Sequence, residues 1–137
     1  SRELLKKNYK NIINSKIIFQ KQNHKIATYT CARTPDDGAI RWQQDDTVKI
    51  HNLIRGLSFP YPGAFCMYKG EKIIIQKSQI PLQRKWSGSV PGRVVGLYNN
   101  GVEVLTCDGS ILITEIEVEG KRIAPQNYFR SIKGTLV

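Results

Sequence analysis

Cysteine is scarce in this sequence, and its spacing excludes the sites that cysteine usually builds. The 137 residues contain three cysteines, Cys31, Cys66 and Cys107, which is an odd number without a C-x-x-C pair. We therefore expect neither a disulfide framework nor a zinc site, and a reducing cytoplasm is the simplest setting. The three side chains are expected to serve as small hydrophobic groups in or near strands.

Long apolar runs are also absent. No segment approaches the ~20 consecutive apolar residues that cross a membrane, and the first residues lack the apolar stretch of a signal peptide. We therefore expect no membrane partner. The 137 residues, 40% of them hydrophobic, suffice for one domain with an attached arm. Because the sequence begins at Ser1 without an initiator methionine, we expect a fragment or a processed product.

Acidic residues are few relative to basic ones. Lysine and arginine number 21 against 11 aspartate and glutamate, which gives a net charge of +10. The imbalance is greatest in residues 1–25, where Glu3 is the one acid. Two further basic clusters are Arg84-Lys85 with Arg93, and Lys121-Arg122 with Arg130 and Lys133. Such charge favours a polyanionic partner such as RNA or DNA, while solubility with local ion pairing is the alternative explanation.

Two segments have the periodicity of amphipathic helices. Residues 2–14 predict a helix with one basic face and one apolar face, which we expect to dock on a partner surface. Its apolar side chains are Leu4, Leu5, Tyr9, Ile12 and Ile13. Residues 47–57 predict a second helix, capped by Asp45 or Asp46. Its expected apolar side consists of Val48, Ile50, Leu53, Ile54 and Leu57.

Connecting segments are marked by proline, glycine and aspartate. Residues 15–31 predict an extended linker with at most a short strand, around Ile17-Ile18-Phe19 or Ala27-Thr28-Tyr29. Thr34-Pro35-Asp36-Asp37-Gly38 predicts a strong turn, because proline presets φ and aspartate binds nearby backbone amides. Pro60-Tyr61-Pro62-Gly63 is stiff, because two prolines fix φ on either side of one residue.

The rest of the sequence is typical of short strands joined by tight turns. The expected strands cover residues 64–68, 72–80, 92–98, 102–107 and 110–118. A break in alternation at Thr114-Glu115 indicates a bulge. A last helical turn is expected from Pro125 to about Ile132. The predicted fold class is therefore mainly β with α: a small open antiparallel barrel preceded by a helix, a linker and a capped helix.

Two motifs resemble a known family. Arg33-Thr34-Pro35-Asp36-Asp37-Gly38, with Ile40 and Trp42, is followed by Asn52-Leu53-Ile54-Arg55-Gly56 and by Phe59-Pro60-Tyr61-Pro62-Gly63-Ala64-Phe65. Together they resemble the region after the catalytic domain in the methionyl-tRNA formyltransferase family, which also includes enzymes acting on nucleotide-linked amino sugars. Pro91 to Val95 and Cys107 to Ser110 fit the strands of that family's C-terminal barrel more loosely.

The resemblance implies how the domains are organised and which of them carries catalysis. Residues 1–32 would be the last helix of a missing N-terminal catalytic domain with its linker, and residues 33–137 a C-terminal barrel of the oligonucleotide-binding type. The family's catalytic Asn, His and Asp lie in the missing domain, with 10-formyltetrahydrofolate as co-substrate. No catalytic residue, metal ligand or bound cofactor is therefore expected here, and His24 and His51 are expected at the surface or half-buried.

Several side chains are candidates for binding or for support of the junction. The substrate or tRNA-binding candidates are Arg84, Lys85, Arg93, Lys121, Arg122 and Tyr61, with Trp86 an aromatic among them. The junction and structural candidates are Asp36, Asp37, Gly38, Trp42, Arg55, Pro60, Pro62 and Gly63. Trp42 is expected to fill the core, with base stacking as its alternative. Arg55 is expected either to pair with a nearby aspartate or to anchor the catalytic domain. Arg41 departs from the family, many members of which carry an acid immediately before the tryptophan.

Three functions remain open at this stage. The first is the C-terminal substrate-binding domain of a cytoplasmic enzyme that formylates methionyl-tRNA, inactive by itself. The second keeps the family and changes the acceptor to a nucleotide-linked amino sugar, although a net charge of +10 exceeds what a small anion requires. The third is a free-standing nucleic-acid-binding barrel, against which the unpartnered apolar face of residues 2–14 argues.

Overall fold

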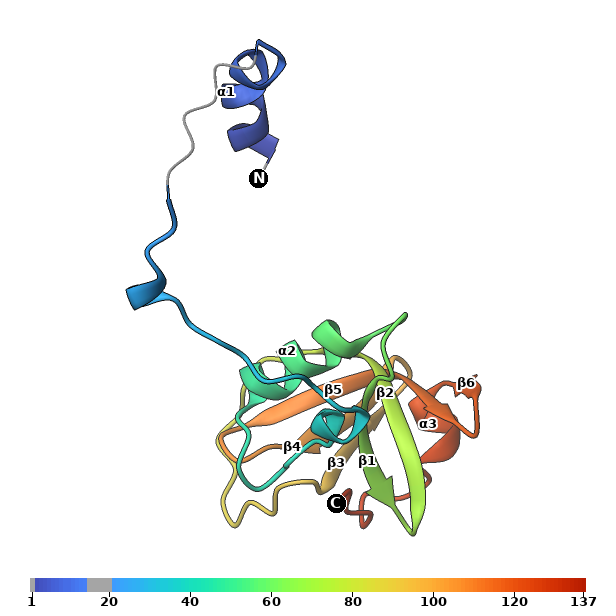
Figure 1. Cartoon of the computed structure of the whole chain (residues 1–137). Helices are drawn as coiled ribbons and strands as arrows, with labels where there is room; N and C mark the ends of the chain where they lie inside the picture. Colours follow the sequence, from blue (N-terminus) through green and yellow to red (C-terminus); the bar gives the residue numbers. More distant parts are fainter. Residues whose placement is uncertain (1, 15–20) are drawn as a thin grey trace. The chain divides into compact units, whose positions relative to one another are not determined.

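The computed structural model describes residues 2–14 and 21–137 (Figure 1). The chain divides into two compact units, Ser1–Ala32 and Arg33–Val137, which are described separately. In the first unit, helix α1 (Arg2–Ile13) forms as predicted, and none of its residues is buried. A single 3-10 turn, η1 (His24–Ile26), follows, and no strand forms at residues 27–29. The strand considered at Ile17-Ile18-Phe19 lies outside the described residues.

The second unit is built on one antiparallel sheet, which confirms the predicted fold class. Its strands are β1 (Ala64–Tyr68), β2 (Glu71–Gln79), β3 (Val94–Tyr98), β4 (Gly101–Leu105), β5 (Ser110–Val118) and β6 (Lys121–Ile123). They are ordered β1-β2-β5-β4-β3, with β6 also paired to β5, so the path of the sheet is open between β1 and β3 (Figure 1).

Strand β6 corrects the expectation of five strands. The chain reverses after β5 at Glu119 and Gly120, which both have positive φ, 50° and 76°. This tight turn returns only three residues to the sheet, too few to show alternation in the sequence. The bulge expected at Thr114-Glu115 is confirmed, because the register between β2 and β5 shifts on both sides of the Lys77–Glu115 pair.

Residues 134–137, here called the seam segment, run between the two open edges of the sheet. On one side Val94 donates to the carbonyl of Gly134 and Leu136 donates to the carbonyl of Gly92, at 2.9 and 2.8 Å. On the other side Met67 of β1 and Val137 exchange two backbone hydrogen bonds, at 2.6 and 2.9 Å. The seam segment thus bridges the gap between β3 and β1.

Two helices accompany the sheet. Helix α2 (Thr47–Leu57) lies beside β2 and β5 and has the predicted bounds (Figure 1). Its buried face includes Thr47, Ile50 and Ile54, whereas Val48 is 56% exposed. Val48 was therefore wrongly assigned to the apolar side. Helix α3 (Pro125–Tyr128) stops four residues before the predicted end at Ile132, because Phe129 leaves the helix and is fully buried.

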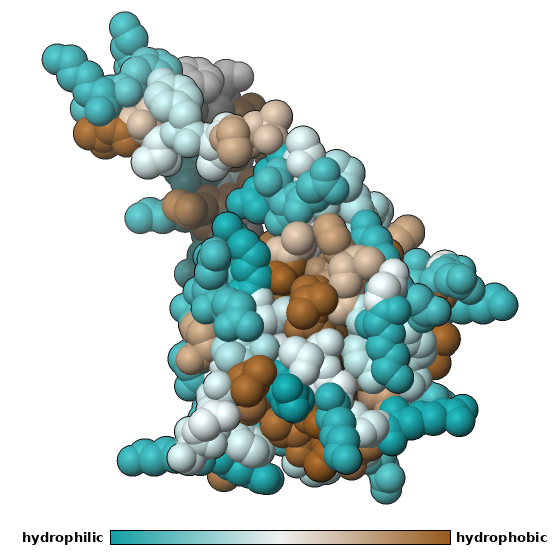
Figure 2. All heavy atoms as spheres, turned by 90° about the horizontal axis from the view of Figure 1, so that it is seen from below, coloured by the Kyte–Doolittle hydropathy of each residue, from teal (hydrophilic) through white to brown (hydrophobic). Residues whose placement is uncertain are grey.

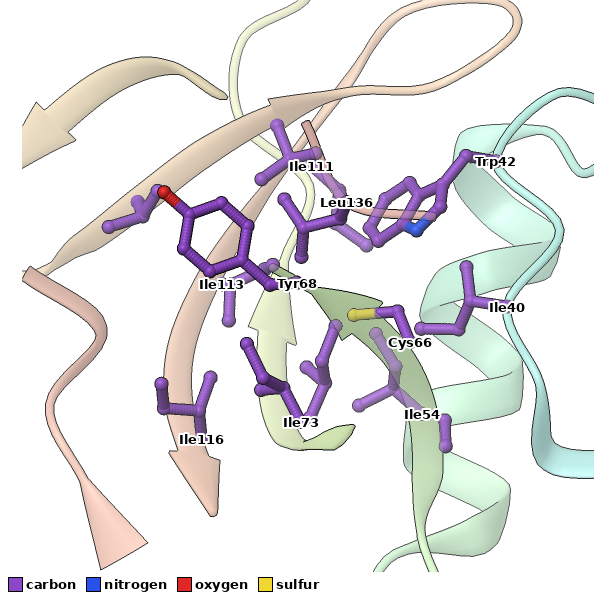
Figure 3. Packing of buried hydrophobic residues seen from close by; sticks show 14 of the residues in the cluster. Ile40, Trp42, Ile54, Cys66, Tyr68, Ile73, Ile111, Ile113, Ile116 and Leu136 are labelled. Atoms are coloured by element: carbon purple, nitrogen blue, oxygen red, sulfur yellow. The ribbon is translucent and has the colours of Figure 1, made fainter. Parts of the chain in front are cut away.

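The core lies between α2, the inner face of the sheet and the seam segment (Figure 3). Trp42, which precedes α2, is 2% exposed, and its ring points toward Leu136 (Figure 3). Cys66 of β1 is buried in this cluster, and Cys107 is exposed in the turn between β4 and β5, so both lie in or near strands as expected. Cys31 is exposed in a segment without a strand, so the expectation was wrong for this residue. Within residues 2–14 and 21–137, no helix combines the length and apolar character that a membrane span requires.

Candidate functional site

The turn at residues 34–38 is held by its own side chains. The backbone N–H of Thr34 donates to the Asp37 carboxylate at 2.7 Å, and this pair closes a capping box on the 3-10 turn η2 (Pro35–Gly38). Gly38 is buried so closely that a Cβ atom there would lie 2.8 Å from the carbonyl oxygen of Gly63. The two family motifs are thus in direct backbone contact, because glycine occupies the crossing point.

A cavity of about 770 Å³ lies between this turn, helix α2 and the segment 61–63, and we call it the turn–helix cavity. Arg33, Arg41 and Lys49 supply its basic side chains, while Leu53, Leu57 and Pro62 contribute to its apolar wall. Its volume lies in the range of small-molecule and peptide sites, ~300–1,000 Å³. Arg33, Lys49 and Asn52 of this cavity were absent from the sequence-based candidates, because nothing in a single sequence shows which exposed face of α2 borders a hollow.

Asp45 is a buried acid in the cavity wall that pairs with two cations. Its side chain is only 3% exposed, with Lys49 Nζ at 2.6 Å and Arg41 Nε at 3.8 Å. Burial acts to raise the pKa of the Asp45 carboxyl, but the two cations and the Arg41 backbone N–H more than offset this, so the pKa lies below its usual value. Arg41, the one departure from the family pattern, therefore faces a buried carboxylate. Asp46 caps α2 instead, accepting from the Lys49 N–H at 2.7 Å.

A second, smaller cavity of about 370 Å³ lies between the loop after β2 and the β4–β5 turn, and we call it the loop cavity. It is lined by Arg84, Lys85, Trp86, Ser89, Cys107, Asp108 and Gly109. Arg84 and Lys85 are exposed and Trp86 is half-buried. The combination of two cations with an aromatic ring suits an anion attached to a flat group.

Helix α2 and the β4–β5 turn beside the loop cavity are joined through Thr47 and Asp108. Oδ1 of Asp108 accepts from the Thr47 N–H and hydroxyl, both at 2.8 Å, and from the Thr106 hydroxyl at 3.0 Å. Desolvation acts to raise the pKa of Asp108, but the hydrogen bonds from these donors lower it by a larger amount. The pKa of this carboxyl therefore lies below its usual value. Thr47 is the first residue of α2, and the β4–β5 turn therefore helps to cap that helix.

Comparison with known proteins identifies the family. The sequence model of the formyl transferase C-terminal domain matches residues 33–133. The chain belongs to the formyl transferase C-terminal domain family. Methionyl-tRNA formyltransferase of Clostridium acetobutylicum is 38% identical over 103 residues, which are 75% of this chain and 32% of the relative. The same enzyme of Ruminiclostridium cellulolyticum is 30% identical over 132 residues, 96% of this chain and 42% of the relative.

The similarity covers only part of each relative. The chain spans about a third of the length of the curated relatives that it matches. Among solved structures, HypX from Aquifex aeolicus in complex with tetrahydrofolic acid superposes with a TM-score of 0.65 over 92% of this chain and 22% of that chain. The identity to HypX is 19%, so this likeness shows the fold alone.

The formyl transferase C-terminal domain disperses the predicted binding residues. It brings Arg84 and Lys85 together at the loop cavity, whereas Tyr61, which is 63% exposed, lines the turn–helix cavity. Arg93 is half-buried at the seam, where its Nε donates to the Thr135 hydroxyl at 2.7 Å. Lys121 is exposed on β6.

Arg122 lies in an ion-pair group on the β5–β6 side of the sheet. Its Nη1 is 3.2 Å from Glu115, which Lys77 also contacts at 2.7 Å. The hydrogen bond from Lys77, with the charge of Arg122, holds the pKa of Glu115 below its usual value despite partial desolvation. Part of the positive charge near β6 is therefore neutralised within the domain.

The predicted junction residues occupy both turns. Asp36 is exposed beside the capping residue Asp37, and Pro60 and Pro62 are exposed on the segment that follows α2. Arg55 is exposed, and its guanidinium donates to Asn52 at 3.5 Å, so the pairing is with an amide and not with the aspartate that the sequence suggested.

The two histidines and the free acids form no catalytic set within the described part of the chain. Nδ1 of His51 lies 2.9 Å from the Ser78 hydroxyl, and burial together with the nearby Arg55 lowers the pKa of its imidazole. His24 is exposed in η1. Across residues 2–14 and 21–137, no group of three or more His, Cys, Asp or Glu side chains is placed to hold a metal ion. What the geometry offers is two hollows with cationic rims.

Proposed function

We propose that this chain is the C-terminal part of a cytoplasmic formyltransferase that transfers a formyl group from 10-formyltetrahydrofolate to the amino group of methionyl-tRNA. The observation that carries the proposal is the family match over residues 33–133, joined by relatives named methionyl-tRNA formyltransferase at up to 38% identity. The regions of those relatives that align with this chain make up only 32 to 35% of their length. The catalytic Asn, His and Asp of the family would belong to an N-terminal domain.

The proposed role of residues 33–137 is to bind and position the acceptor. Its barrel would be of the oligonucleotide-binding type, with Arg84 and Lys85 as exposed neighbouring cations on a loop of the sheet. Phosphate contacts from such side chains supply affinity that does not depend on sequence and falls with salt. The tetrahydrofolate co-substrate would be held by the catalytic domain, and residues 1–137 alone would be inactive.

Residues 1–32 would join the two domains. The apolar side chains of α1 are exposed, among them Leu4 at 67% and Ile13 at 62%. An apolar stripe of this kind is stable when it packs on a second surface, and the proposed partner is the catalytic domain. The turn–helix cavity, with Arg55 and Tyr61 near its rim, would then face the same domain. The chain segments that line the cavity would set the angle at which the barrel leaves the catalytic domain.

A salt-dependent titration of methionyl-tRNA with the 137-residue chain tests the tRNA proposal. Each phosphate contact contributes about 0.7–0.9 to the slope of log K against log salt. The double variant Arg84→Glu/Lys85→Glu should lower that slope by about 2 relative to the parent chain. Lys133→Glu, an exposed residue outside both cavities, is the single-site control and should change it less. Absence of binding at low salt would contradict the tRNA proposal.

The enzymatic half of the proposal has its own test. Formyl transfer to methionyl-tRNA is assayed with residues 1–137 alone and with the protein encoded when the reading frame upstream of Ser1 is included. Activity is expected only for the longer protein, and its upstream region should contain the catalytic Asn, His and Asp. Transfer by residues 1–137 alone would contradict the assignment of catalysis to another domain.

A nucleotide-linked amino sugar is the second candidate acceptor. The observation in its favour is the turn–helix cavity of about 770 Å³, which has the volume of a small-molecule site and three basic side chains. Calorimetric titration with a sugar nucleotide distinguishes the two acceptors. Saturable binding of the sugar nucleotide, in a chain that binds no tRNA at low salt, would favour this second function.

A further inference from the structure

Trp86 in the loop cavity has an indole N–H without a partner. Nε1 of Trp86 is shielded from solvent and has no hydrogen-bond acceptor among the described residues. A buried donor that is left unpaired costs roughly 1–3 kcal/mol. The other tryptophan, Trp42, also has an unpaired Nε1, but it lies in the core at 2% exposure, whereas Trp86 borders an open cavity. Of the two tryptophan rings, that of Trp86 is the one that borders the loop cavity.

The wall beside Trp86 is fixed by a reciprocal pair of hydrogen bonds. The amide of Gln83 donates to the carbonyl of Ser110 at 3.0 Å and accepts from the Ser110 N–H at 2.9 Å. We call this pair the Gln83–Ser110 clamp. A Cβ atom on Gly109 would lie 2.2 Å from the Gln83 side-chain oxygen, so glycine at this position leaves room for the clamp. The loop that carries Arg84, Lys85 and Trp86 is therefore anchored to the β4–β5 turn, and the cavity is formed before any ligand enters.

The charges around the cavity favour an anion. Arg84 and Lys85 are exposed at its rim, and Asp108 is the one acid in its lining. Burial, Asp108 and the more distant Asp46 and Asp45 raise the pKa of the Cys107 thiol in the same lining. The Asp108 carboxylate is already engaged by Thr47 and Thr106 through Oδ1. These donors keep the Asp108 carboxylate ionised, and among the side chains that line the cavity two cations stand against this one acid. Leu82, which precedes these residues in the chain, is 91% exposed. On the face of the molecule seen in Figure 2, apolar side chains emerge among hydrophilic ones.

We propose that the loop cavity binds one unstacked nucleotide of the RNA acceptor, with the base against Trp86 and its phosphate between Arg84 and Lys85. The inference rests on the proposed function and adds a site to it. A volume of about 370 Å³ accommodates a single base and ribose, and Nε1 of Trp86 gains a base or sugar oxygen as its acceptor. Single-stranded nucleotides offer a free base face, whereas bases within a duplex are already stacked.

Binding of a fluorescently labelled tetra-adenylate to the 137-residue chain provides the first test. Loss of a stacking side chain weakens binding by about 5- to 150-fold, so Trp86→Leu should fall in this range, while Trp86→Phe should retain most of the affinity. Lys133→Glu, outside the cavity, should bind like the parent chain. An RNA duplex with the same number of phosphates should bind more weakly than the single strand. Equal affinity of Trp86→Leu and the parent chain would overturn the proposal.

Cys107 provides a second test in which Trp86 is unchanged. Cys107 lines the loop cavity and is exposed, and in a Cys31→Ser variant the remaining cysteine, Cys66, is buried. Alkylation of Cys107 by iodoacetamide should slow several-fold when saturating tetra-adenylate is present. An unchanged rate with the oligonucleotide bound would place the RNA elsewhere on the chain and overturn the proposal.

The two proposals fail in different ways. If methionyl-tRNA binds with normal salt dependence while Trp86→Leu and Cys107 alkylation are unaffected, the nucleotide site is wrong and the proposed function stands. If tetra-adenylate protects Cys107 and methionyl-tRNA does not bind, the cavity is a nucleotide site and the tRNA acceptor is wrong.

Discussion

Thr47 holds one oxygen of Asp108 with both its backbone N–H and its hydroxyl, each at 2.8 Å, across 61 residues of sequence. The first turn of α2 is therefore capped twice. Asp46 accepts from the Lys49 N–H in the local way, and Asp108 accepts from Thr47 across the fold. Because Thr106 also donates to Asp108, this oxygen joins the helix, the end of β4 and the turn before β5.

Removing the distant cap should cost more than removing the local one. Asp108→Ala leaves the Thr47 and Thr106 donors without their shared acceptor, and we expect a loss of about 2–3 kcal/mol in the free energy of unfolding. Asp46→Ala removes one exposed cap and should cost ~1 kcal/mol. Urea unfolding followed by circular dichroism measures both. A smaller loss for Asp108→Ala than for Asp46→Ala would show that the long-range cap is not important for stability.

The carboxylates of Asp45 and Asp108 should make the domain acid-sensitive. The pKa values of Asp45 and Asp108 lie below normal in the folded protein, and ~3.9 is the value expected in the unfolded chain. Their contribution is therefore fully present above pH ~4 and is lost as pH falls through the lower, folded pKa values. Thermal melting between pH 6 and pH 2 should show this decline. Asp108→Asn should flatten it, whereas Asp36→Asn, an exposed residue in η2, should leave the slope unchanged.

Gly92 should tolerate no side chain. It has a φ of 84°, and a Cβ atom there would lie 2.2 Å from the carbonyl oxygen of Leu136. Gly92→Ala should therefore cost the left-handed strain of ~1–2 kcal/mol and a further ~1–3 kcal/mol for overpacking at the seam. Gly120 is a matched control, because its φ is 76° and a Cβ atom there would meet nothing within 4 Å. Gly120→Ala should show the strain alone in chemical denaturation, and equal losses for the two variants would argue against a tight seam.

Arg41 can be tested by restoring the family's acid. Arg41→Asp would place a second carboxylate beside Asp45, whose present neighbours are Arg41 and Lys49. Because Arg41 is exposed, we expect only about 0.5–1 kcal/mol of destabilisation at low salt, and less at 1 M salt. Arg41→Ala, which removes the cation without adding an acid, should lie between the parent chain and Arg41→Asp. A change of the same size at every salt concentration would indicate packing instead of charge.

Local chemistry in the sequence was sufficient for most of the fold. Asp46 before α2 and the hydrophobic periodicity of residues 47–57 predicted that helix with its bounds, and the Asp108-Gly109 turn predicted β5. On α2 the sequence wrongly included Val48 in the buried side and left out Thr47, because a threonine that is buried through hydrogen bonds to Thr106 and Asp108 is indistinguishable in sequence from an exposed one. Strand β6 and the seam segment escaped prediction because each is too short for alternation to reveal it.

The candidate sites were harder to predict from the sequence than the fold. Runs of basic residues indicated that cations matter, but they did not show which cations border a cavity. Arg93 and Arg122 bind Thr135 and Glu115, partners 42 and 7 residues away, whereas Arg84 and Lys85 border a cavity. The loop cavity itself depends on the Gln83–Ser110 clamp, whose two residues are 27 apart in sequence. Contacts between residues this far apart in the sequence depend on the tertiary fold and leave no local sequence pattern.

The seam segment has a consequence for folding and handling of the protein. Without residues 134–137, the unpaired backbone groups of Met67 on β1 and of Gly92 and Val94 beside β3 would face solvent. Exposed strand edges are templates on which other chains can add strands. The seam segment therefore protects two strand edges from intermolecular pairing, and products shortened at this point are expected to aggregate even where the hydrophobic core is otherwise complete.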